Sequence, residues 1–201
     1  MIYRGFFKRV LDIVFSIIGL LFLSPIFLLL MICIKLDSSG PVFFKQQRIG
    51  KGRAAFSIYK FRTMRVDAPH DIPTHLFMNP NDYITRVGRF LRKSSLDELP
   101  QIINILKGEM SFIGPRPALW NQYDLLEARD QNGANDVTPG LTGWAQINGR
   151  DELPFDLKAW LDGEYVAKMG FALDAKIFFL TVANVLTGKD IKEGTKESKL
   201  Y

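Results

Sequence analysis

An uninterrupted apolar run near the N-terminus constrains this chain more than any other feature. The 22 residues from Ile13 to Ile34 include no ionisable side chain other than Cys33. As a straight helix this run is about 33 Å long, enough to cross the hydrocarbon core of a bilayer. It is too long for the apolar part of a signal peptide, and no small-residue cleavage pattern precedes Lys35. The sequence therefore predicts a membrane helix.

Two features favour a re-entrant helix over a spanning one. Ser24-Pro25 lies in the middle of the run, and a proline inside a helix removes one backbone hydrogen bond and clashes with the preceding turn. Both flanks of the run are basic, with Arg4, Lys8 and Arg9 before it and Lys35, Lys45, Arg48, Lys51 and Arg53 after it. A spanning helix concentrates Lys and Arg on one side. We therefore expect a helix broken at Ser24-Pro25 that enters and leaves through the same leaflet, with a kinked spanning helix as the alternative.

Charge and composition narrow the class of protein. Residues 1–62 hold ten Lys and Arg against two Asp, a net charge of +8, whereas the remainder carries −3. Because the surplus positive charge surrounds the apolar segment, it indicates a membrane surface and not nucleic acid. A single cysteine excludes an internal disulfide framework and a cysteine zinc site. The two histidines, His70 and His75, lie in a proline-rich stretch over 65–82 and are interpreted as exposed loop residues.

The rest of the chain predicts an α+β fold that is mainly helical. Residues 42–48 and 54–61, rich in Phe, Ile and Tyr, predict a β-hairpin. Helical spacing predicts helices over 96–106 (with Ser94 or Ser95 as the N-cap), 119–129, 155–169 and 173–186. The last is apolar but too short to span a bilayer, so it is expected to lie in the membrane interface. We expect three parts: 1–36 as the membrane helix with its basic flank, 37–188 as a compact domain at the membrane face, which the resemblance described below identifies as a cytoplasmic catalytic domain, and 189–201 as a charged tail.

Three clusters of residues have the chemistry of a polyanion site. The first is Lys60-Phe61-Arg62-Thr63-Met64; the second runs from Arg92 through the pair Asp97-Glu98 to Gly114-Pro115-Arg116-Pro117; the third is the stretch from Pro139 to Arg150, which includes Gly143 and Trp144. A carboxylate can attack a phosphoryl group, and a neighbouring carboxylate can handle a proton or a metal ion. Prolines on both sides stiffen the backbone of Arg116, which suits a guanidinium aimed at phosphate oxygens.

Each cluster also has an ordinary interpretation. Asp97 and Glu98 stand where acids stabilise a helix N-terminus. The ordinary interpretation of Arg116 is an exposed cation on a rigid loop, and that of the glycine-rich third cluster is a well-packed turn. No cluster matches a phosphate-binding Walker loop, a dinucleotide fingerprint or a catalytic triad.

Taken together and in order, the motifs resemble the monotopic phosphoglycosyl transferases, small bacterial sugar transferases that initiate glycoconjugate assembly. The resemblance rests on the basic N-terminus, the Ser-Pro in the apolar run, KFRTM, SLDELPQ, KGEMS, IGPRP and PGLTGWAQINGR, and it runs from about Phe7 to Leu186. It implies a re-entrant helix, a cytoplasmic site at the bacterial inner membrane, Mg²⁺ and transfer of a sugar-1-phosphate from a UDP-sugar to polyprenyl phosphate.

Carried onto this chain, the resemblance implies that Asp97 is the nucleophile, Glu98 its partner, and Asp97 also a Mg²⁺ ligand. The implied ping-pong reaction expels UMP, leaves a phosphosugar on Asp97 and passes it to the polyprenyl phosphate. Candidate substrate and phosphate ligands are Lys60, Arg62, Arg92, Arg116, Gly143, Trp144 and Arg150. Downstream glycosyltransferases are further candidate partners. The competing hypotheses are another membrane-anchored phosphate-processing enzyme, and a non-enzymatic protein that binds anionic lipid or acts as a scaffold.

Overall fold

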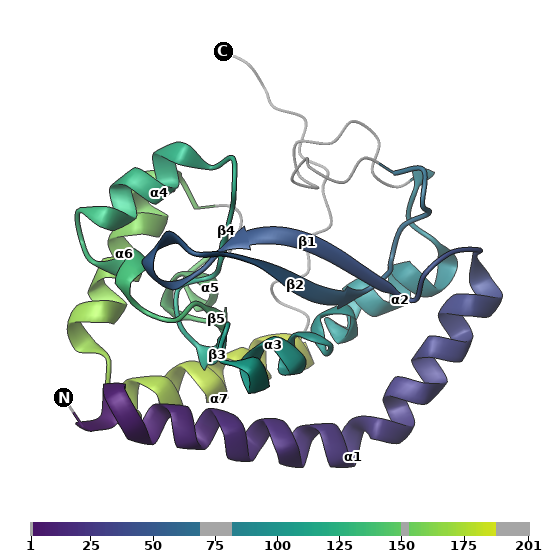
Figure 1. Cartoon of the computed structure of the whole chain (residues 1–201), viewed down its shortest axis with the longest axis horizontal. Coiled ribbons are helices and arrows are strands. Elements are labelled where there is room, and N and C mark those ends of the chain that lie inside the picture. The colour runs from purple at the N-terminus through teal and green to yellow at the C-terminus, as the bar shows by residue number, and fades with distance from the viewer. Residues whose placement is uncertain (1, 69–81, 150–152, 188–201) are drawn as a thin grey trace.

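The computed structural model describes residues 2–68, 82–149 and 153–187, and its fold is mainly helical with short strands (Figure 1). In chain order the elements are η1 (Tyr3–Phe7, a π-helical turn), α1 (Lys8–Asp37), β1 (Phe43–Ile49), η2 (Lys51–Arg53), β2 (Ala55–Phe61), α2 (Arg86–Lys93), η5 (Leu96–Glu98), α3 (Gln101–Lys107), β3 (Ser111–Ile113), β4 (Ala118–Leu119), α4 (Tyr123–Asp130), η6 (Ala134–Asp136), β5 (Gly140–Thr142), α5 (Trp144–Ile147), α6 (Phe155–Lys168) and α7 (Phe171–Thr187).

The predicted β-hairpin is confirmed, and two further strand pairings accompany it. Strands β1 and β2 pair antiparallel from Phe43 opposite Phe61 to Ile49 opposite Ala55. The short strand β4 adds to the free edge of β1, giving the order β2-β1-β4. Strands β3 and β5 form a separate parallel pair. With three residues or fewer, β3, β4 and β5 are too short to show a period-2 pattern, and the sequence did not predict them.

Helix α1 is bent and not broken, which corrects the expected interruption at Ser24-Pro25. The helix is continuous from Lys8 to Asp37 with Pro25 inside it, and Figure 1 shows a pronounced bend partway along it. The Ser24 hydroxyl donates to the Leu21 carbonyl at 2.8 Å, a bond of the kind that accompanies helix bending. The first half of α1 packs against α3, where Arg9 donates to the Ile105 carbonyl, and the second half packs against α2, where Leu30 and Ile34 join Leu91 in one core cluster.

Both ends of α1 are fastened to the same folded body. Near its start, the Lys8 ammonium forms a buried ion pair at 2.5 Å with Asp174 of α7. Just past its end, the Arg62 guanidinium of the hairpin donates to the Ser38 carbonyl at 2.7 Å and to the Ser39 carbonyl. Lys8 and Arg62 therefore attach the two ends of α1 to the folded body. The sequence suggested a membrane-surface charge for Lys8 and a phosphate ligand for Arg62.

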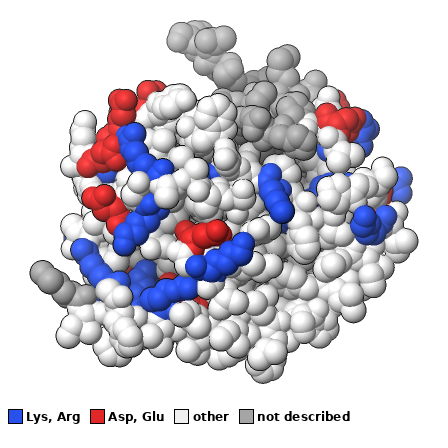
Figure 2. All heavy atoms as spheres, in the orientation of Figure 1, with Lys and Arg blue, Asp and Glu red and all other residues white. Residues whose placement is uncertain are grey.

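The side chains of α1 that face away from the body are almost all apolar. With η1 it forms the one segment, Tyr3–Asp37, that is long and apolar enough to cross a membrane within the described ranges. Helix α7 adds the exposed apolar side chains Phe178, Phe179 and Leu180. In Figure 2 the lower edge of the molecule, where α1 runs in Figure 1, is free of coloured charges. This edge has the composition of a lipid-facing surface.

The remaining helices agree with the sequence in part. Helices α6 and α7 match the expected 155–169 and 173–186 to within two residues. The helix expected over 119–129 is wrong at its start, because β4 occupies 118–119 and α4 begins only at Tyr123. The helix expected over 96–106 is divided into the 3₁₀ turn η5 and α3, with Pro100 at the N-cap of α3. The expected tail 189–201 and both histidines lie outside the described residues.

Candidate active site

The adjacent carboxylates stand on the turn η5, where α2 leads into α3. Ser95, at the N-cap of this turn, has a left-handed backbone with φ +56°, a conformation that costs a non-glycine residue about 1 kcal/mol or more. The Ser94 hydroxyl donates to the Phe90 and Leu91 carbonyls at the end of α2, and Ser95 makes no capping bond. Ser95 therefore occupies the predicted N-cap position without a capping hydrogen bond, whereas Ser94 ends α2. The left-handed backbone at Ser95 sets where Asp97 and Glu98 project.

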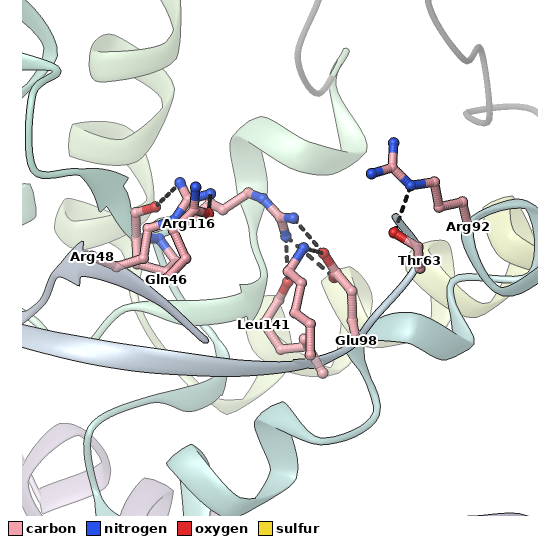
Figure 3. A network of polar contacts seen from close by, with 9 residues as sticks. Gln46, Arg48, Thr63, Arg92, Glu98, Arg116 and Leu141 are labelled. Atoms are coloured by element: carbon pink, nitrogen blue, oxygen red, sulfur yellow. Dashed lines mark hydrogen bonds and ion pairs between the residues drawn. The ribbon is translucent and has the colours of Figure 1, made fainter. Parts of the chain in front are cut away.

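Glu98 is held between two cations that come from distant parts of the chain (Figure 3). Its Oε1 accepts from Lys60 Nζ of β2 at 2.7 Å and from Arg116 Nη2 at 2.5 Å, and Oε2 lies 3.4 Å from Arg116 Nη1. The same Arg116 Nη1 donates to the Leu141 carbonyl at 3.3 Å. Side-chain exposure is low, 19% for Glu98 and 18% for Lys60. The fold thus brings together Lys60, Glu98 and Arg116, one predicted residue from each of three separate motifs.

The two carboxyl groups have opposite electrostatics. Burial alone would raise the pKa of Glu98, but Arg116 and Lys60 outweigh burial by charge and hydrogen bonding and hold that pKa well below its usual range. Burial raises the pKa of Asp97; Lys60, Arg92 and Arg116 oppose this rise while the neighbouring Glu98 charge adds to it. Among the described residues no side chain donates a hydrogen bond to Asp97. Glu98 is therefore a fixed anion, and Asp97 is the desolvated, more basic carboxyl group of the pair.

Arg116 lies on a loop whose backbone packs directly on the backbone of a second loop. The Gly114 amide donates to the Thr142 carbonyl at 2.8 Å, and the Gly140 amide donates to the Pro115 carbonyl at 2.9 Å. A Cβ at Gly143 would lie 2.1 Å from the Gly114 carbonyl oxygen, so no side chain fits there. Gly143 therefore serves close packing of the loops, the interpretation offered as its alternative, and through it the placement of Arg116.

The other predicted ligands are placed differently. Arg92 of α2 donates from Nε to the Thr63 hydroxyl at 2.9 Å, and Figure 3 shows its outer nitrogens directed away from that bond; its charge acts on Asp97. The Trp144 indole donates to Glu164 at 2.7 Å and packs in the core beside β3 and α6, which makes it a packing residue more than a stacking surface. Arg150 lies outside the described residues.

Two arginines that the motifs did not single out support the site. Arg48 of β1 donates to the Pro117 carbonyl at 3.2 Å, and Arg129 of α4 donates to the Arg116 carbonyl at 3.0 Å. In the sequence both look like ordinary polar positions of a strand and a helix. Only the three-dimensional packing places them behind the loop.

The described residues hold no group of three or more His, Cys, Asp or Glu that would bind a metal by itself. Mg²⁺ commonly binds through one or two carboxylates together with substrate phosphates and water. Asp97 fits the role of one such carboxylate, because its oxygens are not taken by a described side chain, whereas those of Glu98 are. The residues present are therefore compatible with a Mg²⁺ that arrives with a diphosphate substrate.

The sequence matches a family of known proteins over most of its length. The family model described as bacterial sugar transferase matches residues 3–188. The chain is 42% identical over 187 residues to the uncharacterised sugar transferase EpsL of Bacillus subtilis, covering 92% of this chain and 90% of that protein. It is also 42% identical over 184 residues to the UDP-glucose:undecaprenyl-phosphate glucose-1-phosphate transferase of Escherichia coli K12, covering 87% of this chain and 39% of the relative.

A third relative, from Aeromonas hydrophila, is the UDP-N-acetylgalactosamine-undecaprenyl-phosphate N-acetylgalactosaminephosphotransferase, at 39% identity over 92% of this chain and 44% of its own length. Several relatives are thus more than twice as long as the segment they share with this chain, whereas EpsL is of similar length. Since the family model covers all three clusters and the apolar helix, the chain belongs to the bacterial sugar transferase family.

Proposed function

We propose that this protein transfers a sugar-1-phosphate from a UDP-sugar to undecaprenyl phosphate and releases UMP. One observation carries the proposal: a carboxyl group with no described hydrogen-bond donor, Asp97, lies beside an anion that is clamped between two cations, Lys60 and Arg116. Relatives with similar sequences are named for this class of transfer from UDP-glucose and UDP-N-acetylgalactosamine. The names differ in the sugar, so the sugar handled here is left open.

In the proposed first step, an Asp97 oxygen attacks the phosphorus that bears the sugar. A P–O bond to Asp97 forms, and the bond from that phosphorus to the bridging oxygen breaks, so that UMP leaves with the bridging oxygen. Loss of hydrogen-bond donors makes a carboxylate a stronger nucleophile, and the raised pKa of Asp97 has the same effect. We assign Arg116 and Arg92 to binding the phosphate oxygens, since the charges of both act on Asp97.

In the second step, an oxygen of the lipid phosphate attacks the same phosphorus and displaces Asp97. The products are the polyprenyl-diphosphate sugar and the free carboxylate. A phosphate monoester is largely ionised at neutral pH, since its second pKa is about 6, so this step needs no strong base. The low pKa of Glu98 makes it a poor base, and we assign it instead to holding Lys60 and Arg116 in place.

Mg²⁺ is proposed to be held by Asp97 together with the diphosphate of the donor. When bound, the ion would offset charge on the diphosphate and on the leaving UMP. No other cofactor is proposed.

We further propose that α1 is a re-entrant anchor in the bacterial inner membrane, with the remaining domain on the cytoplasmic side. The support is that both ends of α1 pack on one body, through Lys8 with Asp174 and through Arg62 with the carbonyls beyond the helix. A helix of 30 residues is about 45 Å long. If it crossed a bilayer, one of these two attachments would have to break. An active site fixed at the membrane face in this way can reach a phosphate whose lipid tail stays in the bilayer.

The test is release of UMP by the purified full-length protein supplied with Mg²⁺, undecaprenyl phosphate and a panel of UDP-sugars. We expect UMP with one or a few of the sugars and a matching lipid product. Asp97→Asn serves as the matched control. If the protein releases UMP over many turnovers without the lipid acceptor, it is a hydrolase. If no UDP-sugar yields UMP, the proposal is refuted.

A further inference from the structure

We propose that Arg129 is a positioning residue that sets the direction of Arg116 from behind the loop. This inference rests on the proposed function, in which Arg116 binds phosphate. Arg129 lies on α4 and is 3% exposed. Among the described residues its hydrogen bonds go to Asp162 and to the Arg116 carbonyl, and none goes to Asp97 or Glu98. Its guanidinium instead joins two helices and the loop.

Three bonds define this junction. Arg129 Nε and Nη2 donate to one oxygen of Asp162, on α6, at 2.9 and 2.5 Å. Arg129 Nη1 donates to the backbone carbonyl of Arg116 at 3.0 Å. Asp162 is fully buried, and its second oxygen has no hydrogen-bond partner among the described residues.

A buried ion pair is a weak means of stabilising a fold, because the cost of removing both charges from water offsets most of their attraction. A well-packed apolar pair would serve the contact between α4 and α6 at least as well. What an apolar pair cannot supply is a donor for the Arg116 carbonyl. The third bond therefore explains the charged pair better than helix packing does.

The carbonyls on both sides of Arg116 are held as well. The Pro115 carbonyl accepts from the Gly140 amide, and the Pro117 carbonyl accepts from Arg48. Three consecutive carbonyls are thus bound by three different elements, β5, α4 and β1. With the flanking prolines fixing φ, the bond from Arg129 restrains the peptide plane that follows the Arg116 Cα, and with it the direction in which the side chain leaves the loop.

The experiment is a double-mutant cycle on kcat/KM for the UDP-sugar, with full-length protein and UMP release as the readout. Arg129→Lys keeps the charge beside Asp162 but loses the fork that reaches the Arg116 carbonyl. We expect a loss of roughly 10- to 100-fold, as displacement of a substrate ligand by about 1 Å produces. In an Arg116→Ala background the same change should cost less than about twofold, because the ligand it positions is gone.

Arg53→Lys is the matched control, because Arg53 pairs with Asp130, the next residue of α4, at the surface. We expect kcat/KM of this variant to stay at the wild-type value. If the melting temperature shows that Arg129→Lys does not fold, Asp162→Asn replaces it. This variant removes the charge that holds the Arg129 guanidinium. Its loss of kcat/KM should be smaller and should again depend on Arg116.

If Arg129 has a purely structural role, Arg129→Lys lowers kcat/KM by the same factor in the wild-type protein and in Arg116→Ala. Equal factors in the two proteins would overturn the inference. An unchanged kcat/KM in Arg129→Lys would also overturn it. If Arg116→Ala has no measurable steady-state activity, single-turnover UMP release is measured instead, with and without Arg129→Lys, in the wild-type protein and in Arg116→Ala. If Arg116→Ala leaves kcat/KM unchanged while the wild type turns over, this inference falls and the proposed reaction stands; if the wild type releases no UMP, the proposed function itself has failed.

Discussion

Replacing Arg116 by lysine separates the charge of this residue from its geometry. The guanidinium reaches Glu98 through two nitrogens and the Leu141 carbonyl through one of them. A lysine ammonium keeps the charge, but it is compact and cannot span both acceptors in one plane. Hydrogen bonds to charged groups are worth about 1.5–3 kcal/mol when buried. Arg116 is 33% exposed, so we take the lower end, about 1.5 kcal/mol, for one hydrogen bond to a substrate phosphate that the ammonium cannot replace, which corresponds to roughly tenfold in rate.

We therefore expect Arg116→Lys to lower kcat/KM for the UDP-sugar by at least about tenfold, and by more if both outer nitrogens of the guanidinium donate to the substrate phosphates. The melting temperature should change little, because the loop is held by its backbone through Gly114, Gly140 and the carbonyls of 115–117. UMP release and thermal unfolding in the same detergent measure the two quantities. The matched control is Arg89→Lys, an exposed arginine on α2. Wild-type activity in Arg116→Lys would show that Arg116 is only a surface cation.

Three further predictions concern the anchor, the loop packing and the clamped glutamate. Cysteines placed at Tyr3 and at Ser39 should both be labelled from the cytoplasmic side of inverted vesicles and protected in intact cells, since both ends of α1 join one body. Gly143→Ala should lower stability by about 1–3 kcal/mol, seen as a lower melting temperature, because the new Cβ would lie 2.1 Å from the Gly114 carbonyl oxygen. Glu98→Gln should slow both formation of the phosphosugar adduct and turnover, because a neutral amide no longer holds the charges of Lys60 and Arg116 in place.

Each of these has its own control. The labelling uses a Cys33→Ser background, because Cys33 is the single native cysteine; reagent access from opposite faces would refute the re-entrant model. Gly5→Ala controls for the added methyl, since a Cβ there meets nothing within 4 Å, and an unchanged melting temperature in Gly143→Ala would contradict the packing argument. Full turnover in Glu98→Gln would remove the glutamate from the mechanism.

Local patterns predicted much of the fold. The β-hairpin and the helices α6 and α7 follow from runs of seven residues or more whose apolar spacing is clear. Pro25 predicted a deformation, but a proline does not say whether a helix bends or stops. That outcome depends on the packing of Leu30 and Ile34 against Phe61 and Leu91, which lie far away in the sequence.

The sequence predicted which residues form the site but not how they are arranged in space. The motifs pointed to Lys60, Glu98 and Arg116, yet 38 and 18 positions separate the two cations from the glutamate they clamp, and no spacing rule links such positions. The pair of Arg129 and Asp162 left no signal, since each looks like a polar residue of an amphipathic helix. Arg62 shows the reverse case: its motif suggested a phosphate ligand, and its contacts give it a structural task.

The central claim is that Asp97 attacks phosphorus, and intact-protein mass spectrometry tests it most directly. The wild-type protein is incubated with Mg²⁺ and the accepted UDP-sugar in the absence of undecaprenyl phosphate. We predict a mass increase equal to one phosphosugar, located on Asp97 by peptide sequencing, with one UMP released per adduct. The increase should vanish when undecaprenyl phosphate is added, and Asp97→Asn should show neither adduct nor turnover. Turnover by Asp97→Asn near the wild-type rate, or steady UMP release with no trappable adduct, would contradict the covalent mechanism.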